Sequence, residues 1–415
     1  MELIKESFPD GTKIGDWFYS FNPDEENLGK EYVVTDYGVK ADGSIQTEKL
    51  QTLIDKISND GGGVMVVPKG TFLTGALFFK KGVNLLVQKD GVIKGSDDIS
   101  DYPIIKTRIE GETCLYFPAL INVDGVDGFT MKGDGVIDGN GERAWKAFWI
   151  RRQWNPDCTN KDEQRPRLVY ISNSKNVTVK GLTLKNSHFW TNHIYKCEKV
   201  RFIDCKIRAP RSLAPSSDAI DIDVCTDVHI KGCIISVNDD AIVLKGGKGP
   251  FADTDKDNGS NERVIVEDCV IEYAHACLTC GSESVHNKNV IVKNINVINA
   301  GRCLWLKMRP DTPQKYELIS LENINGVMDN FIVVAPWTQF FDLKGREDKP
   351  ISVAKNIKIK DCDVKCKIFF NVQKADEQYL LSDFTLENIN ATAEKFGTDY
   401  SVVKNVTVNN VNIKK

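Results

Sequence analysis

Two stretches of the chain, VHIKGCII from Val228 and VIVEDCVI from Val264, share the template that decides the fold. In both, apolar residues occupy the first and third positions, a small turn-prone residue stands fifth, and an apolar residue follows it. Seven more segments fit the same template, and they start at Val177, Val200, Val290, Ile319, Ile357, Phe384 and Val406. Nine copies spaced 22 to 38 residues apart form an internal repeat, which is typical of a coiled or solenoid architecture.

Each copy predicts two strands joined by a corner. Alternation of apolar and polar residues indicates a strand with one buried face. The fifth position favours a bend, because glycine, asparagine and aspartate adopt left-handed or turn conformations at low cost. Its occupants are Gly181, Asp204, Gly232, Asp268, Asn294, Asn323, Asp361, Asn388 and Asn410. Helical patterns of roughly 10 to 15 residues are missing between these strands, which disfavours a doubly wound or TIM-type sheet. The repeat therefore predicts an all-β fold, a single-stranded right-handed parallel β-helix.

The N-terminal half predicts less regular coils of the same helix, for example VMVVPKGTF from Val64. Between residues 47 and 58, one helical face carries Leu50, Leu53, Ile54 and Ile57. We expect this helix to cap the open end of the coil, since an uncovered sheet edge invites further pairing. Residues 1–33 are interpreted as an irregular N-terminal extension and residues 34–415 as one β-helix domain.

The composition is that of a globular protein without a dominant charge. The chain has 415 residues, with 54 Lys and Arg against 58 Asp and Glu, and a formal net charge of −4. This balance does not predict nucleic-acid binding, and no apolar run of about 18 residues predicts a membrane span. The opening residues MELIKESFPDGTKIGDWF lack the apolar core of a signal peptide. We therefore expect a cytoplasmic protein, or a secreted or periplasmic one if a leader has been removed.

The twelve cysteines form no disulfide or metal pattern. The sixth template position contains four of them, Cys205, Cys233, Cys269 and Cys362. We interpret these four as reduced core residues, stacked at about the 4.8 Å spacing of neighbouring strands. The single CxxC motif, Cys277 to Cys280, has no second pair at zinc-finger spacing. The sequence thus predicts no metal site and no cofactor.

Acidic residues break the repeat where a further strand of each coil is expected. Counted from the template starts, three segments fall in register: DDAIVLK from Asp239, HACLTCG from His275 and GRCLWLK from Gly301. The preceding coil has a longer loop, but its segment SDAIDID from Ser217 fits the same strand by its apolar positions. One column then contains Asp218, Asp240, Ala276 and Arg302, and its neighbour contains Ser217, Asp239, His275 and Gly301. Neighbouring residues of a flat strand point to opposite faces, so Asp239 and Asp240 can share a site only if the strand begins with a bend.

Carboxylates on adjacent rungs suit acid–base chemistry. Mutual repulsion raises the pKa of at least one of Asp218, Asp239 and Asp240, which keeps a proton donor available near neutral pH. Glycoside hydrolysis needs such an acid for the leaving oxygen and an ionised partner that activates water. With His275 and Lys307 expected on the same face, we favour this chemistry over aspartates that fill turns or bind a stray cation.

At these residues the chain resembles the polygalacturonase family, glycoside hydrolase family 28. SSDAIDID looks like the family's NTDGID-type motif, NDDAIVLK like its GDD motif, HACLTCGSE like its HG and GSE region, and LWLK like its RIK motif. The stretches VTDYGVKADG, GGGVMVVPKGTF and GDGVIDGNG extend the resemblance from about Tyr32 to the C-terminus.

The resemblance implies an inverting hydrolase on a right-handed parallel β-helix, with pectic oligo- or polysaccharides as substrates. It implies that Asp239 is the general acid, and that Asp218 and Asp240 bind and activate the attacking water. It further implies that His275 maintains the protonation of the acid and that Lys307 contacts a substrate carboxylate.

Three positions depart from the family pattern. Ser217 replaces Thr, Ala276 replaces Gly, and Trp305 replaces the Arg of the RIK motif. The last change removes a guanidinium that in the family grips a uronate, so we expect Trp305 to stack on a less charged pectic sugar. Arg302, in a nearby column, is the alternative source of the missing charge. Lys245, at the end of NDDAIVLK, is a further candidate for substrate binding.

An insertion at about residues 139–167 concentrates aromatic and basic residues, namely Trp145, Phe148, Trp149, Arg151, Arg152, Trp154, Arg165 and Arg167. As a loop, it suits sugar stacking and carboxylate pairing; packing on the coil is an equal alternative. A long wall beside the cleft would block one end and favour exo action on oligosaccharides.

Two other classes of function stay open from the sequence. A pectate-lyase-like eliminase would use clustered aspartates to bind Ca²⁺ beside a cationic base. A noncatalytic carbohydrate-binding β-helix would not need the combination of Asp, His and Lys found here. The sugar, the linkage and the oligomeric state are left open.

Overall fold

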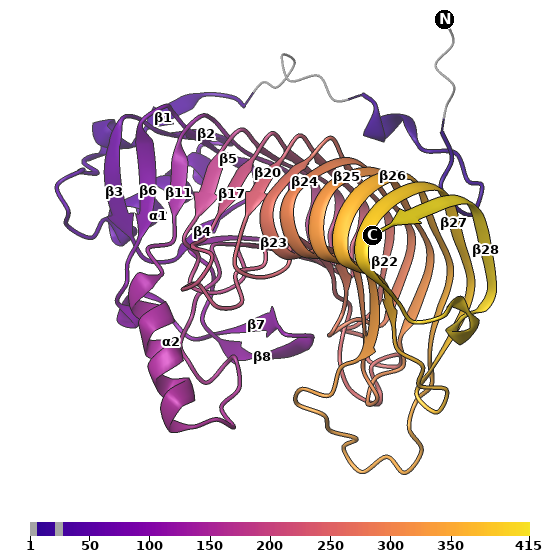
Figure 1. The fold of residues 1–415 in the computed structure, drawn as a ribbon. Coiled ribbons are helices and arrows are strands. Elements are labelled where there is room, and N and C mark those ends of the chain that lie inside the picture. Colours follow the sequence, from indigo (N-terminus) through magenta and orange to yellow (C-terminus); the bar gives the residue numbers. More distant parts are fainter. Residues whose placement is uncertain (1–5, 21–27) are drawn as a thin grey trace, which may run out of the picture.

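The chain winds into a right-handed parallel β-helix (Figure 1). The computed structural model describes residues 6–20 and 28–415. Its main sheet contains 26 of the described strands, and pairing within it is parallel between successive coils. The predicted fold class is confirmed: short strands in three rows build the first coils, and long curved strands build the last ones.

The three rows follow one another around each coil. The first row contains β1 (Glu31–Val33), β2 (Gly63–Val67), β5 (Val83–Val87), β10 (Asp127–Lys132), β13 (Lys175–Lys180), β16 (Glu198–Ile203), β19 (Thr226–Lys231) and β22 (Ser260–Glu267). The second row contains β3 (Gly70–Thr74), β6 (Gly91–Gly95), β11 (Val136–Asp138), β14 (Thr183–Lys185), β17 (Lys206–Arg208) and β20 (Ile234–Ser236). The third row contains β4 (Leu77–Phe79), β9 (Ile121–Asp124), β12 (Val169–Ser172), β15 (Asn192–Tyr195), β18 (Ile220–Asp223) and β21 (Ile242–Leu244).

In the later coils the strands run on around the corners. These long strands are β23 (Val270–Cys280), β24 (His286–Met308), β25 (Lys315–Pro336), β26 (Ser352–Val372), β27 (Tyr379–Gly397) and β28 (Lys404–Lys414). Short 3-10 helices lie at Asp16–Phe18, Val34–Tyr37, Ile99–Asp101 and Tyr400–Val402.

The repeat template is confirmed at the level of register. Val177 pairs with Val200, and the same alignment continues through every template start to Val406. All nine fifth-position residues have a positive φ, between 51° and 77°. Glycine is required at Gly181, because a Cβ there would lie 2.7 Å from the Gly133 carbonyl oxygen. Elsewhere asparagine side chains also bond between rungs, as Asn323 Nδ2 does by donating to Asn294 Oδ1 at 2.9 Å.

The predicted cap and the predicted core cysteines are both confirmed. Helix α1 (Thr47–Asn59) buries the four expected residues, Leu50, Leu53, Ile54 and Ile57, at the N-terminal end of the coil (Figure 1). The cysteines at the sixth template position are free thiols, and all four are buried. Apolar side chains therefore fill the interior along its length and close its first end.

Residues 6–20 form a segment, here called the N-terminal strap, that lies far from α1. Phe8, Ile14 and Phe18 are buried against Ile265 of β22 and Ile291 of β24, on the outer face of the first row. The strap belongs to the expected extension 1–33, of which residues 1–5 and 21–27 lie outside the described residues. The last part of that extension is β1, which already pairs with β2.

Two elements project from the opposite side of the coil to the strap (Figure 1). One is an antiparallel hairpin of β7 (Ile105–Ile109) and β8 (Glu112–Tyr116). The other is α2 (Glu142–Trp154), which corrects the expectation of a loop at residues 139–167. Its sequence ERAWKAFWIRRQW is rich in helix formers. Trp145 and Phe148 are buried, whereas Trp149 and Trp154 on the same helix are exposed.

Candidate active site

A cleft of about 270 Å³ lies along the third row of strands, between the hairpin turn, α2 and the ends of β23 and β25. Its acidic lining residues are Glu110, Asp218, Asp239 and Glu283. Its basic lining residues are Arg152, Lys245, His275 and Lys307. Its aromatic lining residues are Phe148, Trp149, Trp190, Trp305 and Trp337. A larger groove of about 400 Å³ lies beside the strap, away from these carboxylates.

The bend that the adjacent aspartates require is present. Asp239 and Asp240 precede β21, which starts at Ile242, and the Asp240 amide donates to Asp239 Oδ1 at 3.0 Å. The predicted columns also align, because the His275 amide donates to the Asp239 carbonyl oxygen at 2.7 Å and Ala276 pairs with Arg302. The bend explains how neighbouring residues contribute to one site.

Asp239 and His275 form a pair at the edge of the cleft. His275 Nδ1 lies 3.5 Å from Asp239 Oδ1. The bond to Asp239 raises the pKa of His275, although burial opposes this shift. Burial raises the pKa of Asp239, but His275, Lys307 and Lys245 together lower it below its usual range. In the free site, therefore, His275 holds the proton of this pair.

Asp240 and Lys307 form a second, more deeply buried pair. Lys307 Nζ lies 2.8 Å from Asp240 Oδ2, and both side chains are almost fully buried. Asp240 Oδ1 has no hydrogen-bond partner within residues 6–20 and 28–415. One oxygen of this carboxylate is thus paired with the lysine, and the other is buried without a partner among these residues.

Lys245 lies among three carboxylates under the cleft. Its Nζ is 3.0 Å from Glu283 Oε2, 3.7 Å from Asp221 Oδ1 and 3.9 Å from Asp218 Oδ2. Burial opposes the charge of Lys245, yet these acids raise its pKa well above the usual value. Burial raises the pKa of Asp221 to about 8, and burial together with Asp239 raises that of Asp218 well above its usual range.

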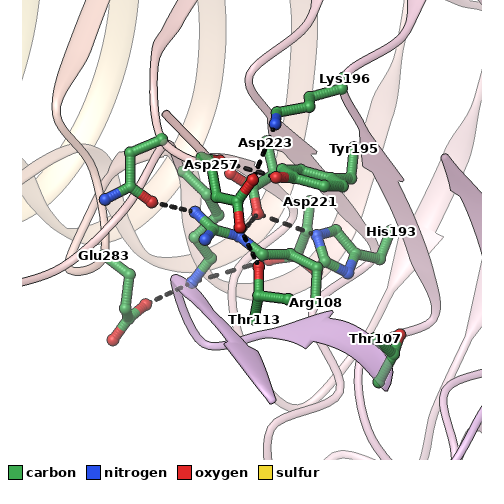
Figure 2. A network of polar contacts seen from close by, with 12 residues as sticks. Thr107, Arg108, Thr113, His193, Tyr195, Lys196, Asp221, Asp223, Asp257 and Glu283 are labelled. Carbon is green, nitrogen blue, oxygen red and sulfur yellow. Dashed lines mark hydrogen bonds and ion pairs between the residues drawn. The ribbon is translucent and has the colours of Figure 1, made fainter. Parts of the chain in front are cut away.

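Glu283 is the ion-pair partner of Lys245. Burial raises its pKa, but Lys245, Lys248 and Arg309 lower it well below the usual value. Figure 2 shows Glu283 at the edge of a polar network that continues to Asp221 and beyond. The pair therefore keeps Lys245 charged beside Asp218, without leaving it free for a substrate carboxylate.

Trp305 and Arg302, which we treated as alternatives, form one stacked unit. The Arg302 guanidinium lies 3.8 Å from the Trp305 ring centre, and Arg302 is absent from the cleft lining. Lys307 Nζ lies 4.1 Å from the same ring, and Trp337 meets it edge-on at 5.4 Å. The Trp305 ring is thus already engaged by cations, and a sugar can reach only what these neighbours leave uncovered.

The aromatic and basic residues of the insertion divide into two groups. Arg165 is buried between Phe148 and Phe189, with its guanidinium 4.3 Å and 4.2 Å from the two ring centres. These residues anchor α2 to the coil. Trp149 and Arg152 instead line the cleft. Both alternatives for this insertion therefore apply, each to different side chains.

Several lining residues were not singled out from the sequence. Glu110 lies in the turn of the hairpin, Trp337 follows β25, and Trp190 precedes β15. Glu283 belongs to the GSE motif, which was the available signal for it. Asp221 appeared in the column alignment without a role. Repeat counting could not place the others, because they lie outside the aligned strands.

A buried network fastens the hairpin to the coil (Figure 2). Arg108 Nε donates to Asp223 Oδ2 at 3.0 Å, and His193 Nε2 lies 3.2 Å from the same oxygen. Arg108 Nη2 also donates to Asn258 Oδ1 at 2.7 Å. Although burial alone would raise it, the pKa of Asp223 is lowered by Arg108 and His193. Asp223 thus supports the wall of the cleft and does not line it.

Within residues 6–20 and 28–415, no three side chains of His, Cys, Asp or Glu are placed to share a metal ion. No helix in the described part of the chain has the length and apolarity needed to cross a bilayer.

The chain combines a parallel β-helix with aspartates clustered in a lateral cleft, and proteins with this combination are the ones to compare it with. A family model described as Glycosyl hydrolases family 28 matches residues 64–330, more than half of the chain. The chain therefore belongs to glycosyl hydrolases family 28, and the resemblance inferred from its motifs is confirmed.

Individual relatives cover the chain only in part. A probable polygalacturonase of Vitis vinifera is 29% identical over 224 residues, which are 52% of this chain and 44% of that protein. A probable endo-xylogalacturonan hydrolase A of Aspergillus oryzae is 27% identical over 283 residues, 65% of this chain and 61% of that protein. The chain thus spans about half the length of the curated relatives it matches.

Solved structures share the fold over nearly the whole chain. An exopolygalacturonase from Thermotoga maritima superposes with a TM-score of 0.78 at 21% identity, covering 93% of this chain and 92% of that one. A polygalacturonase from Erwinia carotovora has a TM-score of 0.71 at 19% identity, covering 95% and 100%. At these identities the likeness establishes the β-helix fold.

Proposed function

We propose that this protein is an inverting glycoside hydrolase that acts on pectic oligosaccharides from a chain end. The observation that carries the proposal is that Asp218 and Asp239 line one cleft, with His275 beside Asp239 and with Asp240 buried next to them in a pair with the lining residue Lys307. Membership of family 28 and the names of its relatives, polygalacturonase and xylogalacturonan hydrolase, support a pectic substrate.

In the proposed reaction Asp239 protonates the leaving oxygen as the glycosidic bond breaks. His275 supplies that proton, since Asp239 raises its pKa and its Nδ1 lies 3.5 Å from Asp239 Oδ1. A water bound between Asp218 and Asp240 attacks the anomeric carbon and passes one proton to a carboxylate. Asp240 is the better candidate for this step, because Lys307 Nζ lies 2.8 Å from its Oδ2, whereas burial and Asp239 raise the pKa of Asp218 and so favour its protonated form.

Attack from the side opposite the acid inverts the anomeric configuration. Inverting sites place the two carboxyl groups roughly 6.5 to 9.5 Å apart, which leaves room for the water. The test follows the first product by NMR during hydrolysis of defined pectic oligosaccharides, in the presence of chelator. A first product of retained configuration would contradict the proposal. Calcium-dependent products that absorb in the ultraviolet would support the eliminase instead, and inertness with intact sugar binding would support a noncatalytic role.

Exo action is supported by helix α2, which contributes Phe148, Trp149 and Arg152 to the cleft lining. Trp149 Nε1 donates to the Leu213 carbonyl oxygen at 2.8 Å, which ties α2 to the segment before Asp218. An exopolygalacturonase is also among the relatives and the structural neighbours. We expect reducing ends to appear without an early fall in the viscosity of a polymeric substrate. A rapid fall in viscosity would indicate endo cleavage.

The substitution of Trp305 supports a preference for modified or less charged pectic sugars over plain polygalacturonan. Because Arg302 stacks on Trp305, the two side chains must be tested together. Trp305→Ala should impair turnover of the preferred substrate, whereas Arg302→Ala should change it little. If Arg302→Ala abolished efficient cleavage of unmodified polygalacturonan, ordinary galacturonate recognition by Arg302 would replace this preference.

A further inference from the structure

Arg152 differs from the other cations of the cleft in its lack of an acidic partner. Lys307 is paired with Asp240 and Lys245 with Glu283, and His275 faces Asp239. Arg152 makes no ion pair with any residue of the described ranges 6–20 and 28–415. It is therefore the cleft cation whose charge is available to an anionic group of a substrate.

The guanidinium of Arg152 is nevertheless held in place by uncharged contacts. Its Nη2 donates to Asn160 Oδ1 at 2.7 Å, and Asn160 Nδ2 in turn donates to Glu110 Oε1 at 2.8 Å. Its carbon Cζ lies 4.7 Å from the ring centre of Phe148. Arg152 Nε is buried without a hydrogen-bond partner among the described residues. The side chain is thus fixed while part of its donor capacity is unused.

Arg152 lies in the part of the cleft that is lined by α2 and the hairpin turn. It belongs to α2, which Trp149 ties to the segment before Asp218. The neighbouring hairpin turn packs closely as well: a Cβ on Gly111 would lie 2.8 Å from the Cβ of Glu283. Trp305 and Lys307 come from other strands, the rungs that follow His275 along the coil.

We propose that Arg152 binds the carboxylate of a terminal sugar acid in this part of the cleft. This inference rests on the proposed hydrolase function and names the group that positions the substrate. A planar guanidinium matches a carboxylate with two parallel hydrogen bonds, which a lysine cannot reproduce. Asn160 separates the guanidinium from Glu110, whose carboxylate can accept hydrogen bonds from hydroxyls of the same sugar. The uronate charge is therefore recognised at α2, and not at the Trp305 position.

The test compares Arg152→Met and Arg152→Lys with the control Arg151→Met. Arg151 lies on the same helix but is exposed and paired with Glu163, outside the cleft lining. The substrates are pectic oligosaccharides that end in galacturonate, either as the free acid or as its methyl ester. We expect Arg152→Met to lower kcat/KM on the acid at least tenfold and on the ester less than twofold. Arg152→Lys should recover only part of the loss, and Arg151→Met should change neither substrate.

A purely structural role of Arg152 would lower activity on acid and ester alike, and that result would overturn the inference. Binding provides a readout that does not depend on turnover. The calorimetric affinity of Asp239→Asn protein for the acid-ended oligosaccharide should fall at least tenfold when Arg152→Met is added. Equal affinities would overturn the inference even if hydrolysis were established. Conversely, a wild-type protein that binds through Arg152 but cleaves neither substrate would refute the proposed function alone.

Discussion

At Asp239 the chain bends before β21 and turns the carboxylate toward His275. Asp239→Asn keeps the volume of the side chain but cannot deliver a proton. Because general acid catalysis contributes about 10²- to 10⁴-fold, we expect a loss of kcat in that range with unchanged thermal unfolding. The measurement is the steady-state rate on an oligosaccharide with a poor leaving group.

The matched control for this variant is Asp134→Asn, since Asp134 is exposed and lies outside the cleft lining. It should retain the wild-type rate. If Asp239→Asn kept more than about a tenth of the wild-type rate, a contribution of 10² or more would be ruled out and Asp239 would not be the acid.

The pH dependence of activity should reveal His275. Its hydrogen bond to Asp239 raises its pKa, although burial opposes the shift, so the imidazole keeps its proton at pH values where a free histidine loses it. A proton is bound below a pKa and lost above it, and the alkaline limb of kcat/KM therefore falls above the ordinary histidine pKa of 6.5. We expect His275→Gln to move this limb to lower pH.

His286→Gln is the control for the pH profile. His286 bonds to Glu317 Oε1 at 3.0 Å and is not among the residues that line the cleft. Its variant should leave both limbs in place. An alkaline limb that stays unchanged in His275→Gln would show that another group supplies the proton.

The sequence could predict a residue of the cleft only where the repeat reaches it. Asp239, Asp240 and His275 are placed together by counting along the template, and Asp218 joins them because the apolar positions of its segment match. Glu110 lies in a hairpin turn outside the repeat, and its partner in the cleft wall is Asn160, far along the chain. No periodicity connects two such segments, so their meeting depends on tertiary packing.

The stability of a corner depends on the backbone conformation and the side-chain bonds of a single residue. Asn323 has a φ of 52°, a conformation that costs most L-residues about 1 to 2 kcal/mol. Asn323→Ala should therefore lower the free energy of unfolding by about 1 kcal/mol. Asn323→Gly removes the bond to Asn294 but accepts the positive φ, and should cost less. The measurement is the urea midpoint of both variants; equal losses would mean that the side-chain bond, and not the backbone, stabilises the corner.

The larger elements also divide into those that a regular sequence pattern predicts and those that depend on tertiary packing. Helix α1 and the strands were predictable because a buried face leaves a regular pattern in the sequence itself. Helix α2 was not, because its contact with the coil depends on Phe148 against Arg165 and leaves aromatic and basic residues on several faces. The hairpin likewise depends on Arg108 meeting Asp223, a partner 115 residues away.

At the scale of the whole molecule, each coil packs on the coil next to it in the chain, but the N-terminal strap packs on strands that lie far along the chain. Removal of residues 1–20 would expose Ile265 and Ile291, which Phe8, Ile14 and Phe18 now cover. We expect a lower unfolding temperature and an unchanged kcat for the protein that remains folded, since the cleft is lined by none of these residues. Phe18→Ala, which should weaken the same contact, should lower the temperature by a smaller amount. An unfolding temperature unchanged by the deletion would mean that the strap adds nothing to stability.

The strap also sets an order of events during synthesis. In a solenoid each coil can pack as soon as its predecessor exists, so folding can advance along the nascent chain from one rung to the next. Residues 6–20 are translated before the coil, but the strands they cover, β22 and β24, are translated much later. The apolar side chains of the strap therefore remain without their packing partners while more than half of the coil is made. The strap precedes the coil in synthesis but can reach its final place only after β24 is complete.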